Sequence, residues 1–258
     1  MTKGSSITLE AVPDVPLIIP GADIAEIIIT TVEDADMIVV DGDIFVIAQK
    51  IISKAEDRYV LLDTVTPSAQ AMELASKAGK DPRLVETILL ESKEVVRCEH
   101  GVIIVEHRLG HVMANAGIDA SNLGTFDDER ERVLLLPCNP DATCAYLRVV
   151  MERHFACRIG ILISDSVGRA WRNGTVGLAL GVAGPPSIWN RVGEDDLTGR
   201  QLRATEVAIA DQIAAAAALV MGEGAEGWPI VKAGGVLWQS SGSGTELLLR
   251  PKDQDLFR

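Results

Sequence analysis

Apolar residues recur three and four positions apart in several segments that open with a capping residue or a proline. This spacing puts the apolar side chains on one face of a helix, and proline suits the first helical position. The pattern predicts helices at Ala22–Val32, from Thr66-Pro67 to Gly79, from Asp81-Pro82 to about Glu91, from Asn139-Pro140 to about Phe155, and at Ala204–Gly222.

Short apolar runs bounded by turn residues predict strands. These runs are Ile44–Ile47, Val102–Glu106, Val112–Ala114, Ile159–Ser164 and Leu178–Val182. The second and third flank Leu109-Gly110 and should form a hairpin, whereas the fourth should end at Asp165. Strands and helices are mixed without regular alternation, so we expect an α+β fold with mixed or antiparallel sheets and packed helices.

The length of 258 residues is close to the upper limit of a single domain. We expect one compact unit over residues 1–258, with room for two lobes and a loose N-terminus at residues 1–6. Hydrophobic residues make up 47% of the chain and aromatic residues only 4%, so the core should be aliphatic. Such a core suits helices packed on sheets.

The formal net charge of −13 argues against a nucleic-acid partner, because phosphates select a positive surface. An acidic protein also repels anionic small molecules such as nucleotides. Bound divalent cations are often the largest local charges in a site and would offset this repulsion. A nucleotide substrate would therefore imply metal ions.

The four cysteines form no C-x-x-C pair, and no secretory signal is evident. We interpret them as reduced, mostly buried thiols of a cytoplasmic protein. No apolar run approaches the roughly 20 residues of a membrane helix, so no membrane partner is expected.

A polar loop, Asn115–Asn122 (NAGIDASN), follows the predicted strand Val112–Ala114. Asp119 can bind a cation, and Asn122 can donate to a base or a phosphate. The same segment can also be an Asx-rich turn or helix cap without chemistry, which is the commoner role of such sequences.

A second cluster, Ser164–Arg169, pairs a carboxylate and a hydroxyl with a Gly-Arg step. Asp165 and Ser166 offer the hard oxygen ligands that suit Mg²⁺ or Mn²⁺. Arg169 and Arg172 offer planar forks for phosphate or carboxylate. A strand-to-turn transition with exposed charges explains the pattern equally well.

The third cluster is Met221–Gly227, in which glycines flank Glu223 and permit close approach of a ligand to the backbone. A helix C-cap followed by an acidic loop is the simpler alternative.

The fourth cluster is Gln49–Glu56, where Lys50 could place a point charge on a phosphate. A solvated lysine at a strand edge is the simpler alternative.

Other features carry less weight. His107 and His111 have metal-ligand spacing only on a helix, and Gly110 argues against a helix there. The Ser240–Gly244 segment is rich in glycine and serine, as most plain loops are. The chain has no P-loop motif, no G-x-G-x-x-G after a strand and no G-x-S-x-G elbow.

In their order along the chain, the motifs resemble those of the coenzyme F420-0:L-glutamate ligase family, also called F420:gamma-glutamyl ligases. The matching segments are VPLI (Val15–Ile18), ISKAE (Ile52–Glu56), NAGIDASN (Asn115–Asn122), SDSVGRAWRNG (Ser164–Gly174), DLTGR (Asp196–Arg200) and MGEG (Met221–Gly224). The similarity runs from about Leu9 to Gly244, and NAGIDASN is its most distinctive part.

The resemblance implies a homodimeric, cytoplasmic ligase that uses GTP, two divalent cations (Mg²⁺ or Mn²⁺) and K⁺. It implies Asp119 and Asp165 on one metal, and Ser166 and Glu223 on a second. The residues implied for the GTP site are Val15, Pro16, Leu17, Ile18, Gln49, Lys50, Lys54, Asn122, Met221, Gly222, Glu223, Gly224, Ala225, Glu226, Gly227 and Trp228.

The implied reaction activates the lactyl carboxylate of F420-0 as an acyl phosphate, which the amine of L-glutamate attacks with release of phosphate. A second cycle could extend the product through its γ-carboxyl. Phosphoryl transfer depends mainly on positioning and charge neutralisation. From residue chemistry alone, Arg169 and Arg172 are candidates for holding the carboxylate or the transferring phosphoryl group. The rival interpretations are a metal-dependent phosphohydrolase and a non-catalytic nucleotide- or deazaflavin-binding module.

Overall fold

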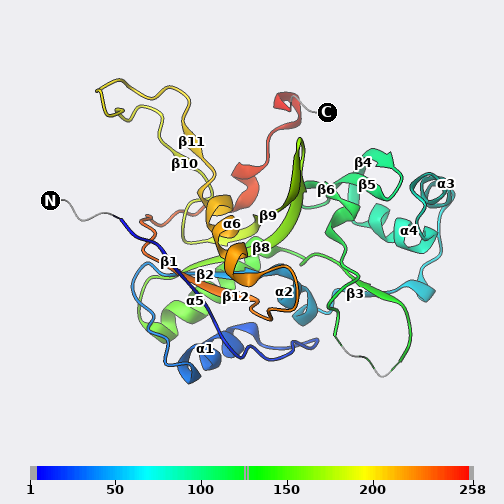
Figure 1. Cartoon of the computed structure of the whole chain (residues 1–258), viewed down its shortest axis with the longest axis horizontal. Coiled ribbons are helices and arrows are strands. Elements are labelled where there is room, and N and C mark those ends of the chain that lie inside the picture. Colours follow the sequence, from blue (N-terminus) through cyan, green and yellow to red (C-terminus); the bar gives the residue numbers. More distant parts are fainter. Residues whose placement is uncertain (1–4, 125, 127, 256–258) are drawn as a thin grey trace.

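The largest sheet has five strands, in the order β1-β12-β2-β8-β9 (Figure 1). The computed structural model describes residues 5–124, 126 and 128–255. The strands are β1 (Thr8–Ala11), β12 (Ile230–Gly234), β2 (Ile44–Ala48), β8 (Gly160–Arg169) and β9 (Arg172–Ala183). β2 and β8 run parallel, and the other neighbours run antiparallel. This mixed sheet confirms the predicted α+β class.

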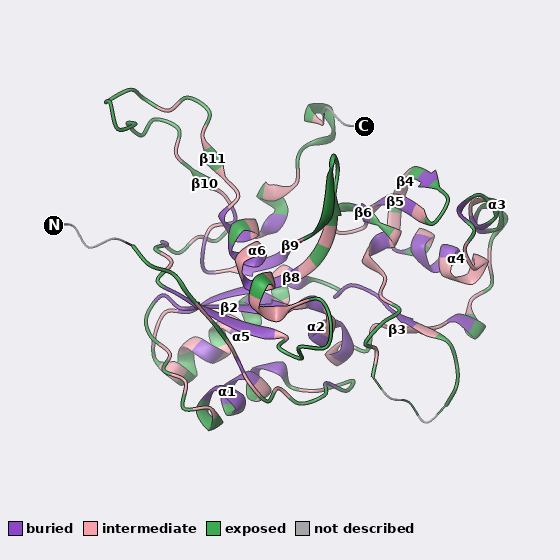
Figure 2. Ribbon diagram, in the orientation of Figure 1, coloured by how far each residue is buried: buried purple, intermediate pink, exposed green. Residues whose placement is uncertain are grey.

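Helices cover both faces of this sheet because its strands are apolar on both sides. In β2, Phe45 and Ile47 face the core shared with α1 (Ile24–Asp34), α2 (Gln49–Ala55) and α5 (Pro140–Phe155). Ile44 and Val46 face the opposite core, formed with α6 (Ile209–Met221). Buried residues accordingly run along β2 from Ile44 to Ile47 (Figure 2). The site described below lies where this sheet meets α2 and α6.

A smaller lobe has a core of its own, built from alanines and branched aliphatic residues. It contains α3 (Ala69–Ala78), α4 (Pro82–Leu90) and a three-stranded antiparallel sheet of β4 (Ser92–Glu99), β5 (Val102–His107) and β6 (Val112–Ala114). The pair β3 (Tyr59–Leu61) and β7 (Arg132–Leu134) lies beside it (Figure 1). The expected two-lobed arrangement and the hairpin around Leu109-Gly110 are both confirmed.

Short elements complete the chain. β10 (Trp189–Asn190) and β11 (Glu206–Val207) form the base of an arm that projects from the body (Figure 1). The 3₁₀ turns are η1 (Leu62–Thr64), η2 (Asn115–Gly117), η3 (Thr245–Leu248) and η4 (Lys252–Gln254). Residues 1–4 of the predicted loose N-terminus lie outside the described residues, and Ser5 and Ser6 are exposed and irregular.

Three predicted helix starts are wrong. The helix α1 begins at Ile24 after its cap Asp23, not at Ala22. Ser68, not Thr66, caps α3, and its hydroxyl accepts a hydrogen bond from the Ala71 amide at 3.2 Å. The longest predicted helix begins at Ile209 instead of Ala204, because residues 206 and 207 pair with β10. The proline-led starts of α4 and α5 are as predicted, capped by Asp81 and Asn139.

The predicted end of the strand at Asp165 is also wrong. β8 continues to Arg169 and pairs with β9 to form a long hairpin. Polar residues beyond Ser164 remain in the strand because the ladder with β9 satisfies their backbone groups. Asp165 and Ser166 therefore lie within a strand, where backbone pairing fixes their directions.

All four cysteines are free. Cys98 and Cys144 are buried, whereas Cys138 is exposed and Cys157 is partly exposed, so only half of them fit the expected burial. Within residues 5–124, 126 and 128–255, no helix is long and apolar enough to cross a membrane.

Candidate functional site

A cavity of about 650 Å³ opens where β2 ends and β8 passes alongside it. Its size falls within the roughly 300–1,000 Å³ of small-molecule sites. It is lined by Val15, Pro16, Leu17, Ile18, Ala48, Gln49, Lys50, Ile51, Lys54, Asn122, Leu123, Gly124, Ser164, Asp165, Ser166, Gly177, Ala218, Met221, Gly222, Glu223, Gly224, Ala225, Gly227, Trp228 and Pro229. All four sequence clusters contribute to this lining.

The structure therefore brings most of the predicted site residues together. Every residue expected at the GTP site lines this cavity except Glu226. Of the expected metal ligands, Asp165, Ser166 and Glu223 line it, whereas Asp119 lies behind Gln49 and Lys50. The segments come from five separated parts of the chain, so only the folded protein assembles them.

Asp119 is fixed from both sides. Its backbone exchanges two hydrogen bonds of 2.9 Å with Leu134, beside the β3–β7 pair. Its carboxylate accepts a hydrogen bond of 2.7 Å from Gln49 Nε2 and lies 3.4 Å from Lys50 Nζ. Lys50 also donates to the Ser121 carbonyl, which anchors the NAGIDASN loop to α2. These contacts hold the side chain of Asp119 at the margin of the cavity.

Asp165 has the most perturbed carboxylate of this group. Burial, which is the largest cause, and the nearby charges of Asp119 and Glu223 together raise its pKa to about 7. The Ser166 amide and the charge of Lys50 act in the opposite direction but do not compensate. Like charges that disfavour each other's ionised form mark a place where a cation would be stabilising.

Lys54 supplies a positive charge on the same wall. Burial lowers its pKa, Lys50 lowers it further, and Asp119 acts to raise it. The residue is only 8% exposed. Its ammonium group has no hydrogen-bond or ion-pair partner among residues 5–124, 126 and 128–255. A buried cation of this kind that faces a cavity is a ready partner for an anionic ligand.

The glycine-rich loop after α6 forms the opposite wall. Gly222 has a φ of +72°, and an added Cβ there would collide with the carboxylate of Glu226. Glu226 also accepts a hydrogen bond of 2.8 Å from the Gly224 amide. Glu226 therefore braces the loop, which explains why it does not line the cavity as expected. Glu223 lies 3.5 Å from the hydroxyl of Thr175 on β9.

Arg169 and Arg172 do not line this cavity. They pair across the tip of the β8–β9 hairpin, where both are exposed. Arg169 donates a hydrogen bond of 3.3 Å to the Asn173 carbonyl. Four residues of extended strand separate Arg169 from Asp165, which corresponds to about 13 Å. The physical reason for this separation is the unpredicted continuation of β8 beyond Asp165.

The acidic side chains alone do not form a closed metal cage. In the described part of the chain, no three His, Cys, Asp or Glu side chains lie close enough together to hold a metal ion. Mg²⁺ commonly uses only one or two carboxylates, together with water and substrate phosphates. Asp165, Ser166 and Glu223, facing one cavity, fit that kind of open site. Asp119 instead bonds to Gln49 and Lys50 and does not line the cavity.

Some cavity residues were not predicted. Gly177 lies opposite Ser166 in the β8–β9 ladder, and α6 packs directly against it. A glycine within a predicted strand can mark such a close approach, but it does not say which element approaches. Leu123 and Gly124 extend the lining beyond Asn122. Their role depends on the path of a loop, which carries no periodic signal.

The two histidines that the sequence analysis discounted lie close together, and the ring of His107 has a structural role. His107 and His111 face each other across the turn of the β5–β6 hairpin, not along a helix. His107 Nδ1 accepts a hydrogen bond from the Leu109 amide, so its proton resides on Nε2, which lies 3.4 Å from Glu91.

The fold and the cavity define a two-lobed α+β protein with an acid-lined ligand site assembled from distant segments. The family model of the F420-0:Gamma-glutamyl ligases matches residues 14–235. The chain is 44% identical to the coenzyme F420:L-glutamate ligase of Methanothermobacter thermautotrophicus, over 98% of this chain and 99% of that protein.

Two further relatives carry the same description. The protein from Methanocaldococcus jannaschii is 46% identical, over 84% of this chain and 85% of the relative. The protein from Archaeoglobus fulgidus is 38% identical, over 96% of this chain and 94% of the relative. The chain therefore belongs to the F420-0:gamma-glutamyl ligase family, and it is a ligase.

Proposed function

We propose that this protein joins L-glutamate to the lactyl carboxylate of coenzyme F420-0 at the expense of GTP. The names of its relatives support the two substrates that become linked. The nucleotide is supported by one observation in particular. A cavity of nucleotide size carries mutually repelling carboxylates at Asp165 and Glu223, and a cation at Lys54 that has no partner among the described residues.

The proposed chemistry begins with transfer of the GTP γ-phosphoryl group to a carboxylate oxygen of F420-0, which leaves GDP. The amine of L-glutamate then attacks the carbonyl carbon of the acyl phosphate, the C–O bond to phosphate breaks, and the amine loses a proton. The products are an amide, GDP and inorganic phosphate. The same steps on the new γ-carboxyl would add another glutamate.

The chain's own residues orient the reactants. Lys54 and Lys50 would hold phosphate oxygens, and the backbone of the Gly222–Gly224 loop would allow the nucleotide to approach closely. Asp119, Asp165, Ser166 and Glu223 would hold Mg²⁺ or Mn²⁺, which would neutralise the negative charge of the transferring phosphoryl group. K⁺, a homodimeric state and a cytoplasmic location belong to the same proposal.

Mass spectrometry of F420-0 incubated with GTP, Mn²⁺ and L-glutamate tests the proposal directly. We expect a glutamyl-extended product that requires all four components, together with GDP and phosphate in equal amounts. GTP consumption that continues without glutamate and F420-0 would favour the phosphohydrolase. Tight GTP binding without any turnover would favour the non-catalytic module.

A further inference from the structure

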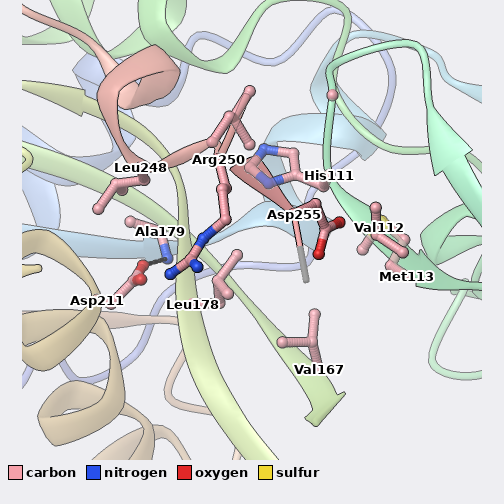
Figure 3. A pocket seen from close by; sticks show the side chains of 12 residues that line it. His111, Val112, Met113, Val167, Leu178, Ala179, Asp211, Leu248, Arg250 and Asp255 are labelled. Carbon is pink, nitrogen blue, oxygen red and sulfur yellow. Dashed lines mark hydrogen bonds between the residues drawn. The ribbon is translucent and has the colours of Figure 1, made fainter. Parts of the chain in front are cut away.

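A second cavity, of about 220 Å³, lies between the two lobes (Figure 3). Its walls come from β6, the β8–β9 hairpin, the start of α6 and the segment that follows η3. Apolar side chains form much of the lining, including Val112, Met113, Leu178, Leu248 and Leu249. The proposed nucleotide site uses none of these residues.

The smaller cavity lies close along β8 to Asp165, which itself lines the larger cavity. Val167 lines the smaller cavity and lies two residues beyond Asp165 on β8, so both side chains are on the same face of the strand, about 7 Å apart. Leu178 pairs with Asp165 across the ladder and also lines the smaller cavity. A molecule in the smaller cavity would therefore lie beside the site proposed for phosphoryl transfer.

The smaller cavity contains polar groups that suit a charged guest. The guanidinium of Arg250 extends into it toward Asp211 (Figure 3). Arg250 makes no hydrogen bond or ion pair within residues 5–124, 126 and 128–255. Asp211 already accepts a hydrogen bond of 3.0 Å from the Ala179 amide, which leaves its second oxygen available.

His111 provides an independent sign of a missing ligand. Its side chain lines the cavity and is only 7% exposed, yet its ring makes no hydrogen bond in the described part of the chain. A mostly buried imidazole that lines a cavity and has no hydrogen-bond partner among the described residues is available to bond to a guest there. Burial, which is the largest cause, and the nearby His107 together lower the pKa of His111 to about 4, so the ring is neutral near pH 7.

We propose that this cavity is the subsite for the free amino-acid substrate, in which Arg250 binds a carboxylate of L-glutamate and His111 bonds to its polar atoms. Asp211 faces the amine, and the aliphatic walls pack against the methylene groups. This inference rests on the proposed ligase function, because it assigns one of the substrates of that reaction.

The size and charge of the cavity favour an amino acid over the other substrates. A volume of about 220 Å³ is below the roughly 300–1,000 Å³ typical of sites for drug-sized ligands, so a deazaflavin with its phosphodiester tail does not fit. GTP is accommodated by the larger cavity. A guanidinium matches a carboxylate through two parallel hydrogen bonds, which a small dicarboxylic amino acid can accept.

Binding of L-glutamate by ligand-observed NMR, together with separate KM values for L-glutamate, GTP and F420-0, tests the assignment. We expect Arg250→Ala to weaken L-glutamate binding at least tenfold and to raise its KM by a similar factor, with the other two KM values within twofold. Val112→Trp should fill the cavity and weaken L-glutamate binding equally without removing a charge. Arg97→Ala removes a charge from an exposed arginine on β4 and should change none of these values.

The assignment is overturned if wild-type protein does not bind L-glutamate, or if both Arg250→Ala and Val112→Trp bind it normally. An equal rise in all three KM values would also contradict it. If both variants lose L-glutamate binding but the wild-type protein forms no glutamyl product, the subsite is upheld and the ligase proposal is refuted. Ligation combined with normal binding by both variants would refute the subsite alone.

Discussion

Gln49 Nε2 donates a hydrogen bond of 2.7 Å to Asp119 Oδ2 across 70 positions of sequence. The amide of Gln49 is held in turn by Ser53, whose hydroxyl donates to Oε1 at 2.8 Å. Gln49 is 3% exposed and Ser53 is fully buried, so the amide of Gln49 is shielded from water. It joins α2 to the NAGIDASN loop and positions the carboxylate of Asp119 at the margin of the cavity.

Replacing Gln49 by glutamate should destabilise the protein by about 1–3 kcal/mol at pH 8, because two carboxylates would then face each other where a hydrogen bond now exists. Urea unfolding measures the effect. The loss of stability should be smaller at pH 4, where a proton shared between the two carboxyl groups restores the hydrogen bond. Gln49→Met keeps the volume without adding a charge, so its deficit should be nearly independent of pH. Equal deficits at both pH values for Gln49→Glu would contradict this account.

Asp165→Asn should have opposite effects on activity and on stability. The pKa of Asp165 is raised from 3.8 to about 7, so its ionised form costs stability, and this cost grows as pH rises from about 4 to 7. Without metal at pH 8, the asparagine variant should therefore be more stable than the wild type, by on the order of 2–4 kcal/mol. Ligation should fall by orders of magnitude, because an amide is a poor substitute for a metal-binding carboxylate.

Thermal melting in chelator at pH 4 and pH 8 measures this stability gain, which should appear only at pH 8. Asp63→Asn serves as a control, because it should change stability at pH 8 in the opposite direction. Hydrogen bonding by Arg130 lowers the pKa of Asp63, so its removal should lower stability at pH 8. An Asp165→Asn variant that is less stable at pH 8, or that retains near wild-type ligation, would exclude the proposed role of this carboxylate.

Metal removal should weaken GTP binding at least tenfold, because Asp165 and Glu223 repel a triphosphate when no cation lies between them. Calorimetric titration with Mn²⁺ and with excess chelator gives the two affinities. Lys54→Met should weaken binding under both conditions by about tenfold, since the ammonium acts on phosphate directly. Equal GTP affinity in Mn²⁺ and in chelator would show that the acidic residues do not act through a metal.

Local signals predicted much of the fold. The caps at Asp81 and Asn139 and the turn at Leu109-Gly110 act within a few residues, and the elements they bound form as expected. The start of α6 was misjudged because the pairing of Glu206 and Val207 with β10 overrides helical propensity. The end of β8 was misjudged for a similar reason, since its partner β9 lies further along the chain.

The site was predicted by residue type more successfully than by arrangement. Motif order named most of the cavity lining, but it gave no means of seeing that Gln49 and Lys50 bind Asp119. That relation depends on where α2 lies relative to a loop about 70 residues away. Arg250 carried no motif, and the spacing of His107 and His111 was set aside. Arg250 and His111 line one cavity because the tail after η3 packs against the turn before β6, where Leu249 contacts Gly110.

Gly177→Ala should destabilise the protein by about 1–3 kcal/mol, because an added Cβ would collide with the carbonyl of Ala214 and push α6 away from β9. The same shift would move the loop that carries Glu223, so GTP binding should weaken as well. Chemical unfolding and calorimetry report the two effects. Gly168→Ala lies on the neighbouring strand with open space around it and should be neutral in both assays. Equal behaviour of the two variants would show that α6 can shift freely.

Glu91 connects the two lobes through charges that should make stability fall at low pH. Its carboxylate lies 2.9 Å from both Arg58 and Arg108, and Arg58 also donates to the Leu136 carbonyl. Burial acts to raise the pKa of Glu91, but hydrogen bonds from His107 and Arg108 and the charge of Arg58 outweigh it and lower the pKa to about 2. The carboxylate therefore stabilises the fold fully above pH 4.5.

This contribution should be lost as pH falls from about 4.5 to 2, and its full size is about 3 kcal/mol. Urea unfolding at steps of pH should show wild-type stability falling toward that of Glu91→Gln across this window, whereas at pH 7 the variant should be less stable by several kcal/mol. Glu99→Gln alters an exposed carboxylate on β4 and should stay within about 0.5 kcal/mol of wild type throughout. A constant gap between wild type and Glu91→Gln from pH 7 to pH 2 would show that packing, and not the charge of Glu91, holds the lobes together.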